Sequence, residues 1–461
     1  MNSVRSMTIR LAVAFGAVLP ALIGLQPAHA QTETVLYSFG SAPDSRYPWS
    51  SLIMDSKGNL YSTTNQGGTN GAGTVFELSP ETGSGCPTGT NTGNGWCESV
   101  LYSFGSVSGD ASNPASSLLL YKSDLYGTTV NGGVVGMECS GLGCGTIFKL
   151  SPAPKKGCAA GTNTGNGWCE SVIYSFAGAG GDGFSPYADL IVDKKGNLYG
   201  TTQYGGENDA GAGTVFELSP EPAGGCATGS NPGNGWCETV LYVFGAAADG
   251  ANPWGGVVMD KEGNLYGTTY GGETGFGGGT VFKLIPEPAG GCPTGSNPGN
   301  GWCETVLYAF GSQSGDGTNP VAGLVMDSKG NLYGTTLYAQ PGGGTVFEVT
   351  PTGAETVLWT FGLIGYDGDN PFDGVIRDSK GNLYGTTDLG GQQGVGMVFE
   401  LSPPAKKGGA WGETPLCSFM GAPNDGAYAR GSLIMDKKGN LYGATQAGGT
   451  IGNGAVFELV P

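Results

Sequence analysis

The residues of this sequence that could do chemistry are carboxylates and aromatic rings, because histidine is nearly absent. The one histidine, His29, lies in an N-terminal segment that we expect to be removed. Without it the chain has no Ser-His-Asp triad, no Cys-His pair and no HExxH zinc site. Carboxylate-only reactions such as glycoside hydrolysis stay open, but no pair stands out among the 38 Asp and Glu residues. We therefore predict no catalytic residue, no metal ligand and no cofactor.

An aspartate recurs along the chain in an Asp-x-x-x-Pro pattern, which raises the hypothesis of a calcium site or a charged pore. Short polar side chains at turns usually accept hydrogen bonds from nearby backbone N–H groups. The densest acidic cluster, Asp367-Gly368-Asp369-Asn370, lacks the glycine and glutamate placement of an EF-hand loop. We therefore interpret the recurring residues as turn caps: Asp44, Asp110, Asp182, Asp249, Asp316, Asp367 and Asp425, the last with Ala429 in place of the proline.

The residue that follows this proline changes type from copy to copy, and function more often resides where repeats differ. We expect these residues to rim a central channel, because each precedes what we take to be an innermost strand. Exposed aromatic faces suit the flat C–H patches of sugar rings, although packing between repeats is the alternative. In chain order the position holds Trp49, Ala115, Tyr187, Trp254, Val321, Phe372 and Arg430.

The glycine-rich loops carry further aromatic residues that could extend such a platform. We therefore take seven residues as candidate ligand-binding groups. They are Trp49, Tyr187, Trp254 and Phe372 from the position after the proline, and Tyr204, Tyr270 and Tyr338 from the loops.

A tandem repeat must position all of these residues. Each unit contains four short β-like runs, which in the first copy are 52–55, 60–64, 74–78 and 99–104. The second and third runs alternate between two faces, as pleated strands do. A short Asp-x-Lys-Gly-Asn connection joins the first two runs, with glycine supplying the positive φ of a tight hairpin. The phrase Gly-Asn-Leu-Tyr recurs at 58–61, 196–199, 263–266, 330–333, 381–384 and 439–442, and a degenerate copy, Asp-Leu-Tyr at 124–126, makes seven.

The chain begins and ends out of phase with this repeat. The first run, 33–39, is a fourth strand without the preceding three, and the last three runs, 433–436, 441–445 and 455–459, lack a fourth. An open solenoid would leave strand edges exposed, whereas joining the two ends closes a ring. We therefore predict an all-β, seven-bladed β-propeller of four-stranded antiparallel blades. It forms a single domain over residues 31–461, and the N-terminal strand completes the last blade.

The phrase Gly-Asn-Leu-Tyr-Gly-Thr-Thr, followed by Gly-Thr-Val-Phe-Glu-Leu within 196–218, resembles the bacterial GloVer tandem repeat. Proteins that contain this repeat are grouped as choice-of-anchor GloVer-containing proteins. The resemblance covers nearly all of residues 33–461 and implies an exported, repetitive β-protein without an assigned activity. The sequence shows no C-terminal anchor pattern, so surface attachment does not follow. Asp-x-x-Gly-Asn-Leu-Tyr is more loosely similar to NHL-like and gluconolactonase-like propellers. A gluconolactonase-like calcium site would use Glu, Asn and Asp, which this chain contains, but the resemblance assigns no particular residues to it.

The 11 cysteines sort by spacing into pairs. Four pairs each enclose ten residues, inside near-identical Gly-Cys…Asn-Gly-Trp-Cys-Glu inserts. In an exported protein this spacing indicates local disulfides, and a metal site is less favoured because the spacing is not Cys-x-x-Cys and no histidine helps. Cys417 replaces a tyrosine of the fourth strand and is predicted to be a packed free thiol. The predicted disulfides are Cys86–Cys97, Cys139–Cys144, Cys158–Cys169, Cys226–Cys237 and Cys292–Cys303.

Residues 1–30 have the features of a cleavable signal peptide. Arg5 and Arg10 precede an apolar run over 11–25, and Ala28-His29-Ala30 forms the small-x-small cleavage pattern. The apolar run is too short for a comfortable membrane span. We therefore expect a secreted or periplasmic protein, monomeric and without a membrane span.

Export would also change the charge of the chain. Its net charge becomes −20, because the 18 remaining Lys and Arg residues face 38 Asp and Glu residues. This acidity disfavours binding to nucleic acid and to anionic membranes.

The leading functional hypothesis is an exported, non-catalytic propeller that acts as a binding or scaffold module for a glycan or another cell-surface component, such as a surface protein. The alternative is a carbohydrate-active or lactone-hydrolysing propeller that uses carboxylates, with or without calcium. A third interpretation is a structural matrix protein whose repeats only assemble.

Overall fold

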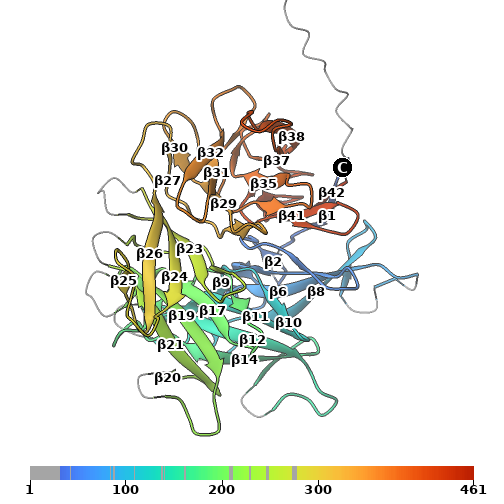
Figure 1. The fold of residues 1–461 in the computed structure, drawn as a ribbon. Coiled ribbons are helices and arrows are strands. Elements are labelled where there is room, and N and C mark those ends of the chain that lie inside the picture. Colours follow the sequence, from blue (N-terminus) through green and yellow to red (C-terminus); the bar gives the residue numbers. More distant parts are fainter. Residues whose placement is uncertain are drawn as a thin grey trace, which may run out of the picture.

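The structure, a computed structural model, describes residues 32–460 except 42, 84, 87–88, 108, 136–138, 140, 160–161, 207–210, 228–229, 246–248 and 273–277. Within these residues every named element is a β-strand (Figure 1). The predicted signal peptide, residues 1–30, lies outside the described residues. In the part of the chain that is described, no helix is long and apolar enough to cross a membrane.

Seven small antiparallel sheets, the blades, follow one another along the chain and form a ring. In blade 1 the strands β3 (Ile53–Met54), β4 (Leu60–Thr64), β6 (Thr74–Pro80) and β8 (Trp96–Ser103) pair in chain order. The strands of blades 2 to 6 pair in the same order. Blade 2 contains β10 (Leu119–Tyr121), β11 (Asp124–Gly132), β12 (Thr146–Pro152) and β14 (Trp168–Ser175), and blade 3 contains β16 (Ile191–Val192), β17 (Leu198–Thr202), β19 (Thr214–Pro220) and β21 (Trp236–Val243). Blade 4 contains β22 (Val258–Met259), β23 (Leu265–Thr269), β24 (Thr280–Pro286) and β26 (Trp302–Ala309), blade 5 contains β28 (Val325–Met326), β29 (Leu332–Thr336), β31 (Thr345–Val349) and β32 (Glu355–Thr360), and blade 6 contains β34 (Ile376–Arg377), β35 (Leu383–Thr387), β37 (Met397–Ser402) and β38 (Gly412–Ser418).

Blade 7 contains strands from both ends of the chain. Its first three strands are β40 (Ile434–Met435), β41 (Leu441–Gly448) and β42 (Ala455–Val460), and its fourth is β1 (Thr32–Ser38). β1 and β42 pair antiparallel, from Thr32 opposite Val460 to Ser38 opposite Ala455, so the first and last strands of the chain lie side by side (Figure 1). The predicted seven-bladed ring and its closure by the N-terminal strand are confirmed.

Four blades are wider than predicted. In blades 1 to 4 the cysteine-bearing insert adds a short fifth strand outside the fourth one, because part of the insert folds back and pairs with it. Strand counting from the repeat alone missed these strands, which are only two or three residues long. They are β7 (Thr90–Asn91), β13 (Asn163–Gly165), β20 (Asn231–Pro232) and β25 (Asn297–Pro298).

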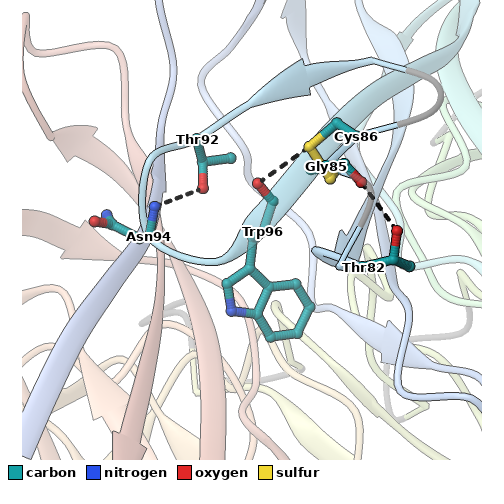
Figure 2. The surroundings of a disulfide bond; sticks show 7 residues. Thr82, Gly85, Cys86, Thr92, Asn94 and Trp96 are labelled. Carbon is teal, nitrogen blue, oxygen red and sulfur yellow. Dashed lines mark hydrogen bonds between the residues drawn. A yellow bond between two sulfur atoms is a disulfide. The ribbon is translucent and has the colours of Figure 1, made fainter.

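The inserts are held both within and between blades. In blade 1 the Asn94 N–H donates to Thr92 Oγ1 at 3.3 Å, beside the disulfide-bonded Cys86 and the indole of Trp96 (Figure 2). The Asn94 side chain donates to Val35 O on the preceding blade at 2.8 Å. The five predicted disulfides are all present: Cys86–Cys97, Cys139–Cys144, Cys158–Cys169, Cys226–Cys237 and Cys292–Cys303.

The hydrophobic core lies between neighbouring blades. A phenylalanine at the end of each fourth strand packs edge-on or tilted against a phenylalanine on the third strand of the next blade, as for Phe176 and Phe216 at 5.3 Å. All of these rings are fully buried, and such pairs contribute about 0.5–1.5 kcal/mol beyond their burial. The other six pairs are Phe39–Phe76, Phe104–Phe148, Phe244–Phe282, Phe310–Phe347, Phe361–Phe399 and Phe419–Phe457.

Candidate functional site

Two sets of loops meet at one end of the ring. The loop that enters each blade pairs with the glycine-rich loop between the second and third strands of the same blade, as β15 (Gly183–Phe184) does with β18 (Tyr204–Gly205). These pairings bring the Asp-x-x-x-Pro segments and the glycine-rich loops onto the same face. Equivalent pairs are β2 (Ser45–Arg46) with β5 (Gln66–Gly67), β27 (Gly317–Thr318) with β30 (Tyr338–Ala339), and β33 (Gly368–Asp369) with β36 (Leu389–Gly390), while β9 (Ala111–Pro114) pairs with β11 and β39 (Gly426–Ala429) with β41.

The recurring aspartates hold these entry loops. Asp182 accepts from the N–H groups of Ala177 and Gly183, both at 2.7 Å, and from the Tyr174 hydroxyl at 3.2 Å. Each of the other six also accepts at least one bond from a backbone N–H of its own turn. Among the described residues no group of three or more His, Cys, Asp or Glu side chains is arranged to hold a metal ion.

A left-handed residue then turns the chain toward the axis of the ring. The residue before each proline has a positive φ, for example 56° at Asn252, a conformation that asparagine tolerates better than most residues. The Asn252 side chain, in the entry loop of blade 4, donates to Gln203 O of blade 3 at 3.0 Å. The residue after the proline is thereby delivered to a fixed place in every blade.

The seven residues that follow the proline line one cavity of 290 Å³. Because every blade contributes one of them, the cavity lies on the axis, at the mouth of the central channel. Tyr187 and Trp254 stack with ring centroids 5.3 Å apart and an angle of 5° between planes. Phe372 meets Trp254 edge-on at 6.4 Å. The lining residues are Trp49, Ala115, Tyr187, Trp254, Val321, Phe372 and Arg430, together with the small or acidic residues that follow them in the chain.

The three loop tyrosines take different places around this cavity. Tyr270 does not line it but stacks on Trp254 at 5.7 Å. Tyr204 stacks on Phe184 at 5.3 Å, and Tyr338 is 47% exposed. Burial raises the pKa of Tyr187, and the neighbouring Tyr204 phenol adds to the rise. Tyr204 and Tyr338 therefore lie on the surrounding surface, outside the cavity.

Arg430 closes one side of the cavity. Comparison of the repeats did not place it among the candidate ligand-binding residues. Its Nε and Nη2 donate to the two carboxylate oxygens of Asp388, each at 3.2 Å. The guanidinium also lies 4.8 Å from the Phe372 ring and 5.9 Å from the Trp49 ring. The sequence does distinguish Arg430, because it is a charged residue at a position that holds aromatic or aliphatic residues in the other repeats.

Two further residues that sequence reasoning missed, Asp189 and Asp373, line the same cavity. They stand one or two residues after the variable position, where other repeats have serine, alanine or glycine, and this difference could have revealed them. Asp373 is half-buried, whereas the Asp189 side chain is exposed to the channel. Burial raises the pKa of Asp373 to about 6, with a further rise from the charge of Asp189. Burial raises the pKa of Asp189 as well.

Hydrogen bonds fix the two carboxylates in place. Asp189 Oδ1 accepts from the Ser117 N–H at 2.6 Å. Asp373 accepts from the N–H groups of Gly374 at 2.7 Å and Ser432 at 2.6 Å. Charge-assisted bonds of this kind are stronger than neutral ones, so the two negative charges are held rigidly in the channel.

The same network joins the blades in a belt around the channel. The Ser432 N–H donates to Ser51 Oγ at 2.8 Å, and the Ser51 N–H donates to Ser117 Oγ at 3.0 Å. With the bonds to Asp189 and Asp373, the belt runs from blade 6 through blades 7, 1 and 2 to blade 3. On the remaining side Gly256 and Gly323 have no side chain, so the belt is open there.

Known proteins resemble this chain in its repeat and, at low identity, in its fold. No curated protein matches it. A candidate 6-phosphogluconolactonase from Bacteroides uniformis has 15% identity and a TM-score of 0.41, covering 90% of this chain and 89% of that one. PorZ, a surface component of the type-IX secretion system of Porphyromonas gingivalis, has 13% identity and a TM-score of 0.40, covering 86% and 45%. A Dyadobacter fermentans protein of unknown function has 12% identity and a TM-score of 0.40, covering 93% and 97%.

The repeat itself is specific. The Gloeobacter/Verrucomicrobia repeat matches residues 20–155, 170–361 and 297–461, nearly the whole chain. With seven copies of one phrase and one blade formed by each copy, the chain belongs to the Gloeobacter/Verrucomicrobia repeat family.

Proposed function

We propose that this propeller is an exported, monomeric, non-catalytic binding module that takes a carbohydrate into the aromatic cavity at the mouth of its channel. One observation carries the proposal. The position after the proline differs in chemical type between the repeats, and its seven copies converge on a single cavity, while the residues that form the blades stay nearly constant. A purely structural propeller has no need to vary those positions together.

The lining of the cavity suits a sugar. Tyr187, Trp254 and Tyr270 form a stacked series of rings, and aromatic faces with polar edges bind the C–H patches of a pyranose while leaving its hydroxyls solvated. The volume of 290 Å³ is just below the range of about 300–1,000 Å³ for small-molecule sites. We therefore expect the cavity to accept the end of a glycan, with Tyr204 and Tyr338 available to the part that remains outside.

Export is supported by the disulfides and by the sequence of residues 1–30. Five disulfides are typical of proteins that fold outside the reducing cytosol. An extracellular or periplasmic glycan is then an accessible ligand.

The proposal is tested by screening residues 31–461 on a glycan array with and without calcium. Trp254→Ala and Tyr187→Ala should each weaken selective binding by at least about tenfold, because a buried aromatic anchor contributes well over 1.4 kcal/mol. Tyr366→Ala is the matched control, since Tyr366 is 75% exposed and does not line the cavity. An empty array, or equal losses in all three variants, would contradict the proposal.

Hydrolysis by carboxylates is the second candidate function, and Asp189 and Asp373 in one cavity are the observation that favours it. Glycosidases use two carboxylates, one of them with a raised pKa. Both oxygens of Asp373, however, already accept backbone N–H bonds, which suits a fixed charge better than a proton donor. Release of reducing ends or lactone opening by the wild type, with or without calcium, and its loss in Asp373→Asn would establish catalysis in place of binding.

A further inference from the structure

The cavity holds two negative charges that no cation of the protein neutralises. Among the described residues the ion pairs are Lys149–Asp124 and Arg430–Asp388, and neither includes Asp189 or Asp373. Backbone N–H groups and a serine hydroxyl surround the two carboxylates instead. The charge of Asp189 disfavours ionisation of the half-buried Asp373, and a cation placed between the two carboxylates would relieve that repulsion.

Arg430 does not supply that cation. Its guanidinium donates hydrogen bonds to both carboxylate oxygens of Asp388 and lies over the ring of Phe372. The Arg430–Asp388 pair is neutral as a unit, so the lining of the cavity keeps the charge of Asp189 and Asp373. The site therefore combines an aromatic wall with an acidic interior.

We propose that the ligand of this cavity is an amino sugar with a free amine, whose ammonium group sits against Asp189 and Asp373 while its ring lies against the aromatic wall that includes Tyr187 and Trp254. This inference rests on the proposed function, which it narrows from carbohydrates in general to the cationic ones. The aromatic wall serves both parts of such a ligand, because ring faces attract C–H patches and ammonium groups alike.

The chemistry discriminates against neutral sugars. An N-acetylated sugar replaces the ammonium group with an amide, which carries no charge and would leave both carboxylates without a counter-ion. A site that pairs with a charged group disfavours analogues that lack the charge, because the ligand then displaces water from the carboxylates without replacing its interactions. The net charge of −20 that remains without residues 1–30 also favours the approach of a cation at low ionic strength.

The repeat offers variants that test the charges without disturbing the fold. Serine stands at the place of Asp189 in blades 1, 2 and 7, as Ser51, Ser117 and Ser432. Serine also stands at the place of Asp373 in blades 1 and 2, as Ser50 and Ser116. Asp189→Ser and Asp373→Ser therefore introduce a residue that the same blade geometry already accepts. Glu262→Gln is the matched control, because it removes one charge from an exposed turn outside the cavity.

The experiment is calorimetric titration with two oligomers of equal length, one of glucosamine and one of N-acetylglucosamine, at near-neutral pH and physiological ionic strength. We expect the wild type to prefer the glucosamine oligomer by at least about tenfold, and Asp189→Ser and Asp373→Ser each to reduce that affinity by about tenfold. Glu262→Gln should bind like the wild type. Thermal melts of the variants verify that each is folded.

The outcomes separate the two proposals. Equal binding of both oligomers, with loss in Trp254→Ala, would overturn the amine inference and leave the carbohydrate-binding function standing. Binding of the glucosamine oligomer that Glu262→Gln weakens as much as Asp189→Ser does would show non-specific charge attraction and overturn the inference. If neither oligomer bound but another glycan bound through Trp254, the inference would again be wrong. If no binding depended on Trp254, both proposals would fall.

Discussion

At the scale of single residues, glycine decides how closely the blades approach. Gly213 precedes the third strand of blade 3 with a φ of 98°, and a Cβ there would lie 2.4 Å from Thr202 O and 2.7 Å from Pro253 Cδ. Pro253 belongs to the entry loop of the next blade, which delivers Trp254 to the cavity. The same glycine–proline contact recurs at Gly73 with Pro114. The repeated Gly-Thr-Val-Phe phrase thus positions the variable residue of the neighbouring blade.

Gly213→Ala should therefore be strongly destabilising. We expect a loss of about 2–4 kcal/mol, from a left-handed backbone that alanine disfavours and from overpacking against Pro253. Gly58→Ala is the control, since Gly58 has a φ of 87° but nothing within 4 Å of the added Cβ, and it should cost only about 1 kcal/mol. Chemical denaturation measures both. Equal losses would mean that the contact with the proline contributes nothing.

At the scale of elements, the disulfide inserts act as clasps between blades. Each begins after the third strand, and the Asn234 side chain of the blade 3 insert donates to Val172 O of blade 2 at 2.6 Å, while its N–H donates to Ile173 O at 3.1 Å. Asn300 makes the equivalent bond to Val240 O at 2.9 Å. Of the insert residues that the structure describes, none lines the cavity. These elements therefore stabilise the ring and leave ligand recognition to the loops at the cavity.

Removal of one clasp should affect stability and spare binding. The Cys226→Ser/Cys237→Ser double variant should lose about 3 kcal/mol, because the bond closes a loop of 11 residues and constrains the unfolded chain. Denaturation with and without a reductant measures the loss, and titration with the ligand should give an unchanged affinity. Cys417→Ser is the control, since Cys417 forms no disulfide. A fall in affinity for the double variant alone would place the inserts in the binding site.

At the scale of the whole molecule, buried carboxyl pairs recur at the boundaries between blades. In six of the seven blades a glutamate on the fourth strand lies near the turn-capping aspartate of an adjoining loop. Burial, with an added rise from Asp182, raises the pKa of Glu238 to about 8. Burial and the neighbouring Asp44 do the same to Glu98. In the closing blade burial raises the pKa of Glu33 to about 7, the hydrogen bond from Cys417 opposes this rise, and the neighbouring Asp425 adds to it.

These pairs predict that the ring loses stability at alkaline pH. The pKa of each glutamate is about 8 in the folded state and 4.5 in the unfolded state. Between these two pH values the folded state therefore binds more protons than the unfolded state. The stabilising contribution is complete below about pH 4.5 and is lost as the pH rises through about 8. Melting temperatures measured between about pH 5 and about pH 9 should fall.

A neutral isostere separates this effect from general charge repulsion. Glu238→Gln should flatten the alkaline part of the profile, because glutamine cannot ionise in the buried site. Glu262→Gln, on an exposed turn, should leave the profile unchanged. Identical profiles for the wild type and both variants would show that the paired glutamates do not control the pH dependence.

The sequence by itself determined the architecture and the residues that differ between repeats. Hairpins such as 52–64 are local, so their strands could be read from alternation and from the Asp-x-Lys-Gly-Asn turn. The unpaired first strand and the incomplete last blade then required a ring. Comparison of the copies also singled out Trp49, Tyr187, Trp254 and Phe372. A position that changes between copies of one repeat is not fixed by the structure that the copies share.

Only the tertiary structure decided which of these residues meet. Trp49 and Arg430 are far apart in the chain and line one cavity because the ring returns to its starting point. The pairing of Arg430 with Asp388, and the meeting of Asp189 and Asp373 in one cavity, depend on the rotation between blades. A repeat pattern shows which positions of the chain are equivalent, but it does not show which side chains come close together across the axis of the ring. Proximity there is set by inter-blade packing, and so the chemistry of the cavity emerges only in the folded ring.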